Sequence, residues 1–150
     1  MSPSVGRSLA RESEPGTAEL LGSLTLDYAP RSPSLARQFV KIALTARGIN
    51  AETEALDVVV SELVTNSVMH ARPVTSASIR LRLWQVRHLI RVEVYDADPR
   101  IPMPRKTKPD DERGRGIYII RDLAANQGFY RNRTGKCVWV DVNIRLGKEE

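Results

Sequence analysis

Apolar and polar residues alternate over residues 24–26, which predicts a short strand that ends at Tyr28. Ser32 then supplies an N-cap, and Pro33 occupies the first position of the helix that follows. Apolar side chains continue at helical spacing as far as Gly48, which ends this helix. The pattern therefore predicts a strand followed closely by a helix.

The rest of the chain contains a second helix and then strands joined by short turns. The predicted elements are a helix at 51–71, strands at 79–83 and 90–94, a long loop at 99–113, a helix from 114 that includes Ala124 and ends before Gly128, and strands at 129–133 and 136–144 around Thr134-Gly135. Strands joined by tight turns pair antiparallel, and helices grouped along the chain favour one covered face. We therefore expect an α/β fold of the α+β two-layer sandwich type, with a mixed, mainly antiparallel sheet covered on one face by helices.

Composition places this fold in one domain. The chain has 150 residues, of which 41% are hydrophobic and 27% charged, as in an ordinary globular protein. Residues 1–22 are rich in Ser, Pro and Gly without any period, so we expect a disordered tail before a domain at 23–146. The single cysteine, Cys137, and the absence of a signal sequence or a membrane-spanning run predict a cytoplasmic protein. The net charge of +5 comes from scattered basic residues, which does not favour direct nucleic-acid binding.

The helix at 51–71 contains the sharpest chemical signal. On a helical wheel, Glu62, Asn66 and His70 form a stripe beside the apolar face, between the buried and the solvent arcs. The buried arc comprises Leu56, Val60, Leu63, Ser67 and Ala71, and the solvent arc comprises Glu54, Asp57, Ser61, Thr65 and Arg72. A stripe in this position is suited to line a cleft.

The residue types of this stripe fit phosphate chemistry. The amide oxygen of Asn66 suits Mg²⁺, and Glu62 one turn earlier is placed to accept a proton beside a metal-bound phosphate. His70 is better explained by packing or hydrogen bonding than by metal ligation, because no second His or Cys stands at ligand spacing. The alternative is an amphipathic helix whose edge is simply polar.

Asp96 follows the predicted strand that begins at Ile90 and lies on the same face as Val92 and Val94. A carboxylate at the end of a core-facing row needs a partner, and the exocyclic amine of adenine would supply one. The alternative is a strand-terminal Asp that caps the next turn.

The sequence Gly114-Arg115-Gly116 stands at a predicted helix start. Two glycines allow the backbone to approach an anion closely, and the free N–H groups of the first helical turn favour phosphate. Arg113 and Arg115 are placed to pair with phosphate oxygens. The alternative is a flexible turn between the loop and the helix.

In chain order, these three elements resemble the nucleotide-binding motifs of the GHKL (histidine kinase-like) ATPase superfamily. Residues 62–71 resemble the N-box, residues 94–96 the adenine-reading G1 motif, and residues 114–117 the G2 motif that follows the ATP lid. Within the superfamily, the chain is similar to anti-sigma-factor serine kinases and to small ATP-binding regulators of actinobacteria. The resemblance covers residues 23–144.

The resemblance implies a Bergerat fold, with Mg²⁺ and ATP as cofactors and transcription regulation as the role. It assigns Glu62 as the catalytic base on a partner serine, Asn66 as the Mg²⁺ ligand and Asp96 as the adenine reader. The implied ATP-binding residues are Asn66, His70, Asp96, Ala97, Arg113, Gly114, Arg115, Gly116, Ile117 and Thr134. The implied partners are a STAS-type anti-anti-sigma protein, a sigma factor, and a second copy of the chain in a homodimer.

Two departures from the family pattern keep other functions open. The glycines that usually follow the G1 aspartate are replaced by Ala97 and Pro99, and Thr134 precedes Gly135 instead of following it. An ATP-binding or partner-binding module without turnover is therefore the alternative function. A detached catalytic domain of a two-component histidine kinase is a third interpretation, which the lack of a phosphoacceptor helix pair disfavours.

Overall fold

The computed structural model describes residues 18–50, 53–70, 77–98 and 123–144. Within these ranges the chain forms five strands and two helices. In order they are β1 (Ala18–Leu26), α2 (Ser32–Ala46), α3 (Glu54–His70), β2 (Ile79–Val86), β3 (Leu89–Asp96), β4 (Ala124–Asn132) and β5 (Gly135–Asn143). The described helices include none that is long and apolar enough to cross a membrane.

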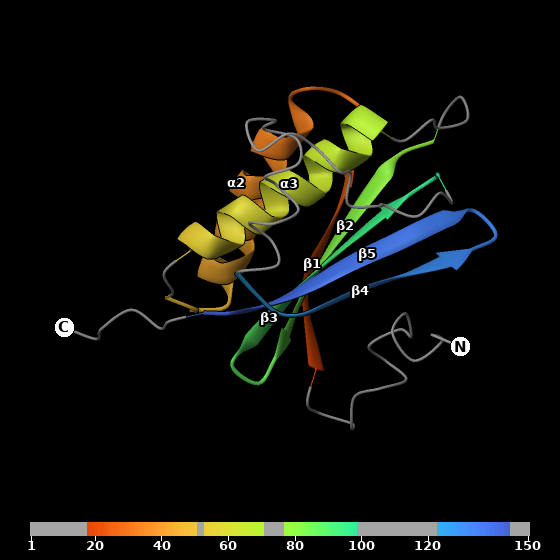
Figure 1. Cartoon of the computed structure of the whole chain (residues 1–150). Helices are drawn as coiled ribbons and strands as arrows, with labels where there is room; N and C mark the ends of the chain where they lie inside the picture. Colours follow the sequence, from red (N-terminus) through yellow and green to blue (C-terminus); the bar gives the residue numbers. More distant parts are fainter. Residues whose placement is uncertain (1–17, 51–52, 71–76, 99–122, 145–150) are drawn as a thin grey trace, which may run out of the picture.

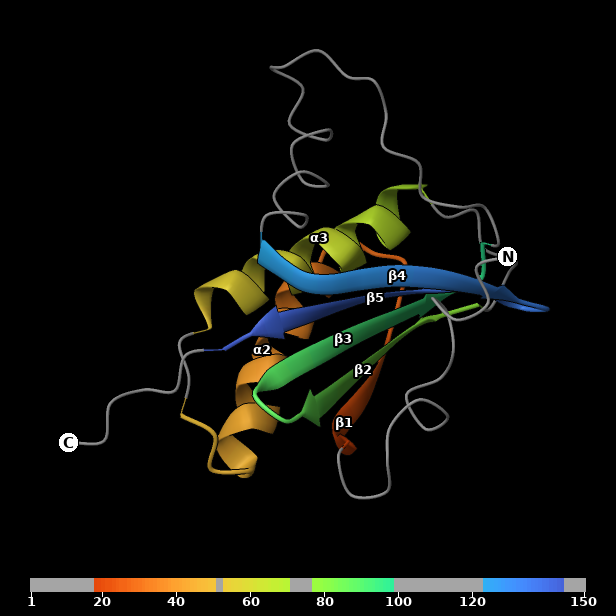
Figure 2. The same ribbon diagram turned by 60° about the horizontal axis from the view of Figure 1, so that its bottom comes forward.

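The strands form one sheet in the order β1-β2-β3-β5-β4, which Figure 2 shows across its width. All four pairings between neighbouring strands are antiparallel, so the described sheet contains no parallel pair. Both helices lie on one face of the sheet, with α2 against α3 (Figure 1). The expected two-layer α/β sandwich is confirmed.

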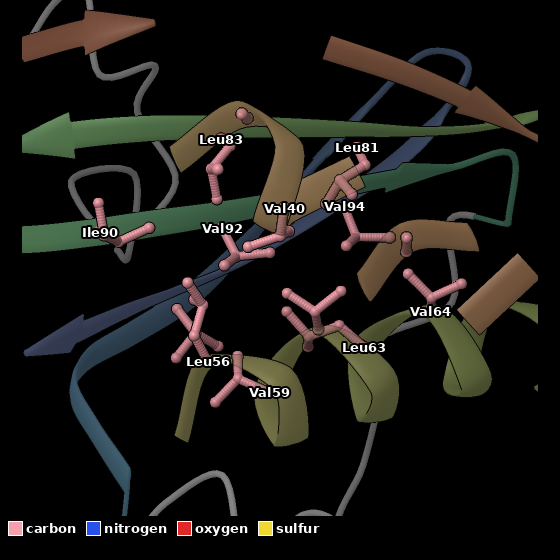
Figure 3. Close-up of a cluster of buried hydrophobic side chains, with 14 of the residues drawn as sticks. Val40, Leu56, Val59, Leu63, Val64, Leu81, Leu83, Ile90, Val92 and Val94 are labelled. Carbon is pink, nitrogen blue, oxygen red and sulfur yellow. The ribbon is translucent and has the colours of Figure 1, made fainter. Parts of the chain in front are cut away.

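A single apolar core lies between the helices and the sheet. Figure 3 shows side chains of α3 directed toward side chains from alternate positions of β2 and β3. Its fully or almost fully buried members include Val40, Leu56, Val59, Leu63, Val64, Leu81, Leu83, Ile90, Val92 and Val94. Burying one such side chain stabilises a protein by about 1.5–3 kcal/mol. The core therefore fixes α3, and the Glu62–Asn66 stripe that it carries, against the sheet.

β1 begins at Ala18, so residues 18–22 belong to the sheet and not to the predicted tail. The pairing with β2 shifts in register between Leu20 and Gly22. Such an irregularity inserts an extra residue and interrupts the alternation of apolar and polar side chains. The alternation therefore reveals only the part of the strand after Gly22. Residues 1–17 lie outside the described residues.

The helix expected to include Ala124 was placed too far along the chain, because β4 begins at that residue. Ala124 pairs with Val142, and Gln127 with Val140, before the turn to β5. The local sequence is weak in strand formers, so cross-strand pairing with the Val-rich β5 overrides the helical pattern. The final hairpin was predicted correctly, although β4 is longer than expected. The predicted loop at 99–113 and the helix start at 114 lie outside the described residues.

The start of α2 differs by one residue from the prediction. Arg31 occupies the N-cap position without a side-chain capping bond, and Pro33 lies in the first turn. The Ser32 hydroxyl instead donates to the carbonyl of Asp27 at 2.6 Å and is buried. The Ser32 hydrogen bond thus joins the start of α2 to the residue that follows β1. Gly48, with φ of 68°, follows the end of α2 as predicted.

Candidate nucleotide site

Glu62 and Asn66 lie at the edge of the buried face of α3. Both side chains are half-buried, whereas Leu63 and Val64 between them are buried. Burial raises the pKa of the Glu62 carboxyl above its ordinary value. A carboxyl with a raised pKa is a better proton acceptor once it is ionised, which is the property a general base requires. The helical wheel predicts these two residues beside the buried face, and in the structure both are half-buried next to Leu63 and Val64.

The predicted solvent arc of α3 is only partly exposed. Asp57, Ser61 and Thr65 are half-buried, and Glu54 alone of the described members is exposed. The reason is the neighbouring helix, since Arg37 of α2 donates to the Ser61 hydroxyl at 2.8 Å. The packing of α2 against α3 cannot be deduced from the wheel of one helix. The side chain of His70 lies outside the described residues.

Asp96 is buried on the helix-facing side of the sheet, as its strand parity predicts. The Ser67 hydroxyl donates to its Oδ2 at 2.7 Å, and the Asp98 N–H donates to its Oδ1 at 2.9 Å. Ser67 directly follows Asn66 on α3. The hydrogen bond between Ser67 and Asp96 therefore joins the end of β3 to the helix that carries Glu62 and Asn66.

Lys136 at the start of β5 is the residue of this site that the sequence analysis missed. Its Nζ donates to Asp96 Oδ1 and to the Asp98 carbonyl, both at 2.9 Å. The Lys136 and Asp96 side chains are only 9% and 2% exposed, so the ion pair is buried. A signal was present, because Lys136 ends the core-facing row of Val138 and Val140 in the way that Asp96 ends its own row.

Gly135, the first residue of β5, lies very close to the backbone at the end of β3. A Cβ atom at Gly135 would lie 1.8 Å from the Asp96 carbonyl oxygen and 2.8 Å from the Ala97 Cα. Its φ of 156° is also a conformation that side-chain-bearing residues rarely adopt. Only glycine permits this contact, and the contact places Lys136 beside Asp96.

Tyr28 fixes the backbone immediately after Asp96. It lies two residues beyond the end of β1, and its hydroxyl accepts the Ala97 N–H at 2.9 Å. Burial raises the pKa of Tyr28, the Ala97 bond opposes that rise, and the nearby carboxylates of Asp96 and Asp98 add to it. Ala97, a predicted ATP-binding residue, is thus held beside the cluster that Ser67, Asp96 and Lys136 form.

Thr134 does not join this cluster. It is exposed in the turn between β4 and β5, where its N–H and hydroxyl both bond to Asn132 Oδ1, at 2.9 and 3.0 Å. The turn uses the hydroxyl that the resemblance assigned to ATP. The remaining predicted ATP-binding residues, Arg113, Gly114, Arg115, Gly116 and Ile117, lie outside the described residues.

Asn66 is the side chain of this site that could hold a Mg²⁺ ion together with a nucleotide. The described part of the chain holds no group of three His, Cys, Asp or Glu side chains able to bind a metal ion by itself. Protein-bound Mg²⁺ in nucleotide sites typically takes one or two side-chain oxygens, and phosphates and water supply the rest. The half-buried amide of Asn66 fits that requirement.

Comparisons with known proteins bear on the family and the fold of this chain. A family model described as a histidine kinase-like ATPase domain matches residues 27–142. A solved structure of the RsbU and RsbW domains of Rv1364c from Mycobacterium tuberculosis is similar at a TM-score of 0.56 and 16% identity. That match covers 85% of this chain and 33% of the other, so the chain spans about a third of that structure. No curated protein matches.

The solved structure supports the fold, and the family model also specifies the ligand class. The matched region extends from Asp27, the residue before Tyr28, to Val142 in β5, and it includes Asn66, Asp96 and Lys136. This protein therefore belongs to the histidine kinase-like ATPase domain family of the GHKL superfamily, whose domains bind ATP.

Proposed function

We propose that this protein is an anti-sigma-type regulator that uses ATP to phosphorylate a serine of a STAS-type anti-anti-sigma partner. The observation that carries the proposal is the Ser67–Asp96 hydrogen bond of 2.7 Å, which joins the buried carboxylate to the Glu62–Asn66 helix. The N-box resemblance and the fold likeness to a chain containing an RsbW domain support it. A sigma factor is the second proposed partner, and this role implies a cytoplasmic location.

Asp96 retains the capacity to accept adenine in addition to its protein partners. An ionised carboxylate has about four acceptor positions. Ser67, Asp98 and Lys136 use three of them. The fourth is proposed to accept the exocyclic amine of adenine.

Asn66 and Glu62 are proposed to act on the phosphate end of the nucleotide. Asn66 would hold Mg²⁺ through its amide oxygen, and the bound metal would neutralise charge on the phosphates. Glu62 would accept the proton of the partner serine as the serine oxygen bonds to the γ-phosphorus. The bond from that phosphorus to the bridging oxygen then breaks, and ADP leaves. The half-buried position and raised pKa of Glu62 support the role of base.

Replacing Glu62 by glutamine is expected to slow phosphate transfer by about 10²–10⁴-fold, the usual contribution of a general base. ATP binding should remain, because glutamine keeps the size of the side chain. The wild-type rate should rise with pH as the carboxyl ionises, at higher pH than for an ordinary glutamate, because the pKa is raised. The measurement is transfer from Mg-ATP to a STAS partner across pH, beside calorimetry with ATP.

Glu54→Gln provides the matched control, since Glu54 is exposed on the same helix two turns earlier. It should leave transfer unchanged. Equal rates for wild type and Glu62→Gln would exclude Glu62 as the base. ATP binding without transfer in the wild type would instead favour the alternative function, a regulatory module without turnover.

We also propose that the protein forms a homodimer through α2 and β1. Leu35 and Ile42, two turns apart on α2, are 41% and 67% exposed. β1 is the edge strand beside this helix, and Leu20 on it is 36% exposed. Arg47, just beyond α2, pairs with Glu19 of β1 and so joins the two elements. A second copy would cover this apolar surface and the free strand edge.

The substitution Ile42→Glu is expected to weaken dimerisation about tenfold or more, because a charge replaces an apolar contact at the centre of the surface. Sedimentation or light scattering across protein concentration measures the shift. Gln127→Glu adds the same charge at an exposed polar position on β4, at the opposite edge of the sheet, and is the control. A wild-type protein that stays monomeric at high concentration would contradict the dimer.

A further inference from the structure

Lys136 presents a hydrogen-bond donor directly beside the acceptor proposed for adenine. Its ammonium carries three N–H groups. The Asp96 carboxylate and the Asp98 carbonyl accept two of them. Within the described part of the chain, these contacts leave one donor available to a ligand at the same place.

The two groups together form an edge that matches adenine. Asp96 Oδ1 accepts from both Lys136 and Asp98, whereas Oδ2 accepts from Ser67 and keeps one acceptor position. Because Lys136 Nζ lies 2.9 Å from Oδ1 of the same carboxylate, this free acceptor and the Lys136 donor belong to neighbouring groups. Adenine presents its 6-amino donor next to a ring-nitrogen acceptor, the pattern that an Asn or Gln amide reads in a bidentate contact. The free acceptor of Asp96 and the donor of Lys136 therefore suit two adjacent hydrogen bonds to one base.

The position of Lys136 is fixed independently of any ligand. Its Cα is paired with that of Asp96 in the β3–β5 register, and Gly135 permits the close approach of the two strands. The side chain is 9% exposed and bonded at two points, so it has little freedom to move away. Such a preorganised group discriminates between ligands, because a wrong base leaves a buried polar atom unpaired.

From this geometry we infer that Lys136 is a base-specificity residue of the ATP site. It donates a hydrogen bond to a ring nitrogen of adenine, next to the amine that Asp96 accepts. The inference rests on the proposed reading of adenine by Asp96. The competing role for Lys136 is that of a counter-ion to Asp96 and nothing more. A counter-ion would not distinguish one purine ring from another.

The test measures the dissociation constants of the full-length protein for ATP and for 1-deaza-ATP and 7-deaza-ATP. Each analogue keeps the 6-amino group and loses one of the two ring nitrogens that flank it. One analogue is expected to bind the wild type about 10- to 100-fold more weakly than ATP, the usual loss for a hydrogen bond to a charged group. Equal binding of all three ligands to the wild type would overturn the inference without any variant.

Lys136→Met then assigns the lost contact. ATP and the weak analogue should bind this variant within about twofold of each other, because the donor is absent. Lys136→Arg, which retains a donor, should restore part of the discrimination. If Lys136→Met binds the weak analogue as much more weakly than ATP as the wild type does, another group contacts the ring nitrogen and the inference fails. Thermal melting confirms that each variant is folded.

Purine riboside triphosphate, which lacks the 6-amino group, separates this inference from the proposed function. It should bind weakly to both the wild type and Lys136→Met, because the Asp96 contact is lost in each. Strong binding of this analogue by the wild type would contradict adenine reading by Asp96, and with it the inference. Weak binding combined with equal affinities for ATP and the deaza analogues would overturn the role of Lys136 alone.

Discussion

Replacing Asp141 by alanine is expected to lower the free energy of unfolding by about 3–5 kcal/mol, the usual cost of removing one partner of a buried ion pair. Asp141 on β5 accepts two hydrogen bonds from Arg91 on β3, at 2.6 and 2.9 Å. The side chains of Arg91 and Asp141 are 10% and 3% exposed. Without the carboxylate, the guanidinium would remain buried without its counter-ion. Urea denaturation followed by circular dichroism measures the change.

The control for this variant is Asp27→Ala, because Asp27 pairs with Arg31 at 2.8 Å but both side chains are exposed, at 73% and 69%. An exposed pair contributes about 0–1 kcal/mol, so this change should have little effect. The double variant Arg91→Met with Asp141→Leu should recover much of the stability, because no charge is left unpaired. If Asp141→Ala lowers the free energy of unfolding no more than Asp27→Ala does, the buried pair does not stabilise the sheet.

Replacing Asp96 by asparagine is expected to weaken ATP binding by about 10- to 100-fold, the loss associated with one hydrogen bond to a charged group. The amide keeps the shape of the carboxylate but offers one acceptor oxygen in place of two. Lys136 would also lose its buried counter-ion, so the melting temperature should fall. Calorimetry with ATP and a thermal melt report these two effects separately.

The double variant Asp96→Asn with Lys136→Met separates recognition from stability. It removes the unpaired ammonium, so stability should return toward that of the wild type while ATP binding stays weak. ATP affinity within about twofold of the wild type in Asp96→Asn would contradict the proposed adenine contact.

The sheet face opposite the helices shows where sequence patterning falls short. Arg91 and Glu93 alternate with core residues of β3, which ordinarily predicts exposed positions, yet they are 8% and 3% exposed. Arg91 lies over the Trp139 ring at 4.1 Å, and the Trp84 indole N–H donates to Glu93. Burial raises the pKa of the Glu93 carboxyl. These contacts join three strands, and the alternation within one strand does not specify them.

Cross-strand contact on this face also involves aromatic hydroxyls. The Tyr130 hydroxyl of β4 donates to the Tyr95 hydroxyl of β3 at 3.1 Å, and their rings meet edge to face. Cys137 of β5 lies between their strands, and burial raises its pKa to about 12. Its thiol therefore stays protonated near neutral pH, as expected for a packing residue and not a reactive one.

Local patterns in the sequence determined the elements whose periodicity is intact. Period-two alternation located β2 and β3, and helical spacing located α2 and α3, because each depends on neighbours a few residues apart. The same local geometry placed Glu62 and Asn66 at the edge of α3 and Asp96 on the inner face of β3. The fold class and the family resemblance followed from these features.

Only the tertiary structure decided which distant residues meet. Lys136 is 40 positions from Asp96, and Ser67 is 29 positions away, yet both bond to its carboxylate. Strand register, which the packing of the whole sheet sets, determines such contacts, and a local pattern does not encode it. The same long-range pairing turned Ala124 and the residues after it into β4 and extended β1 back to Ala18. The sequence thus determined the residues of the Glu62–Asn66 helix, and the tertiary contacts determined what lies beside it.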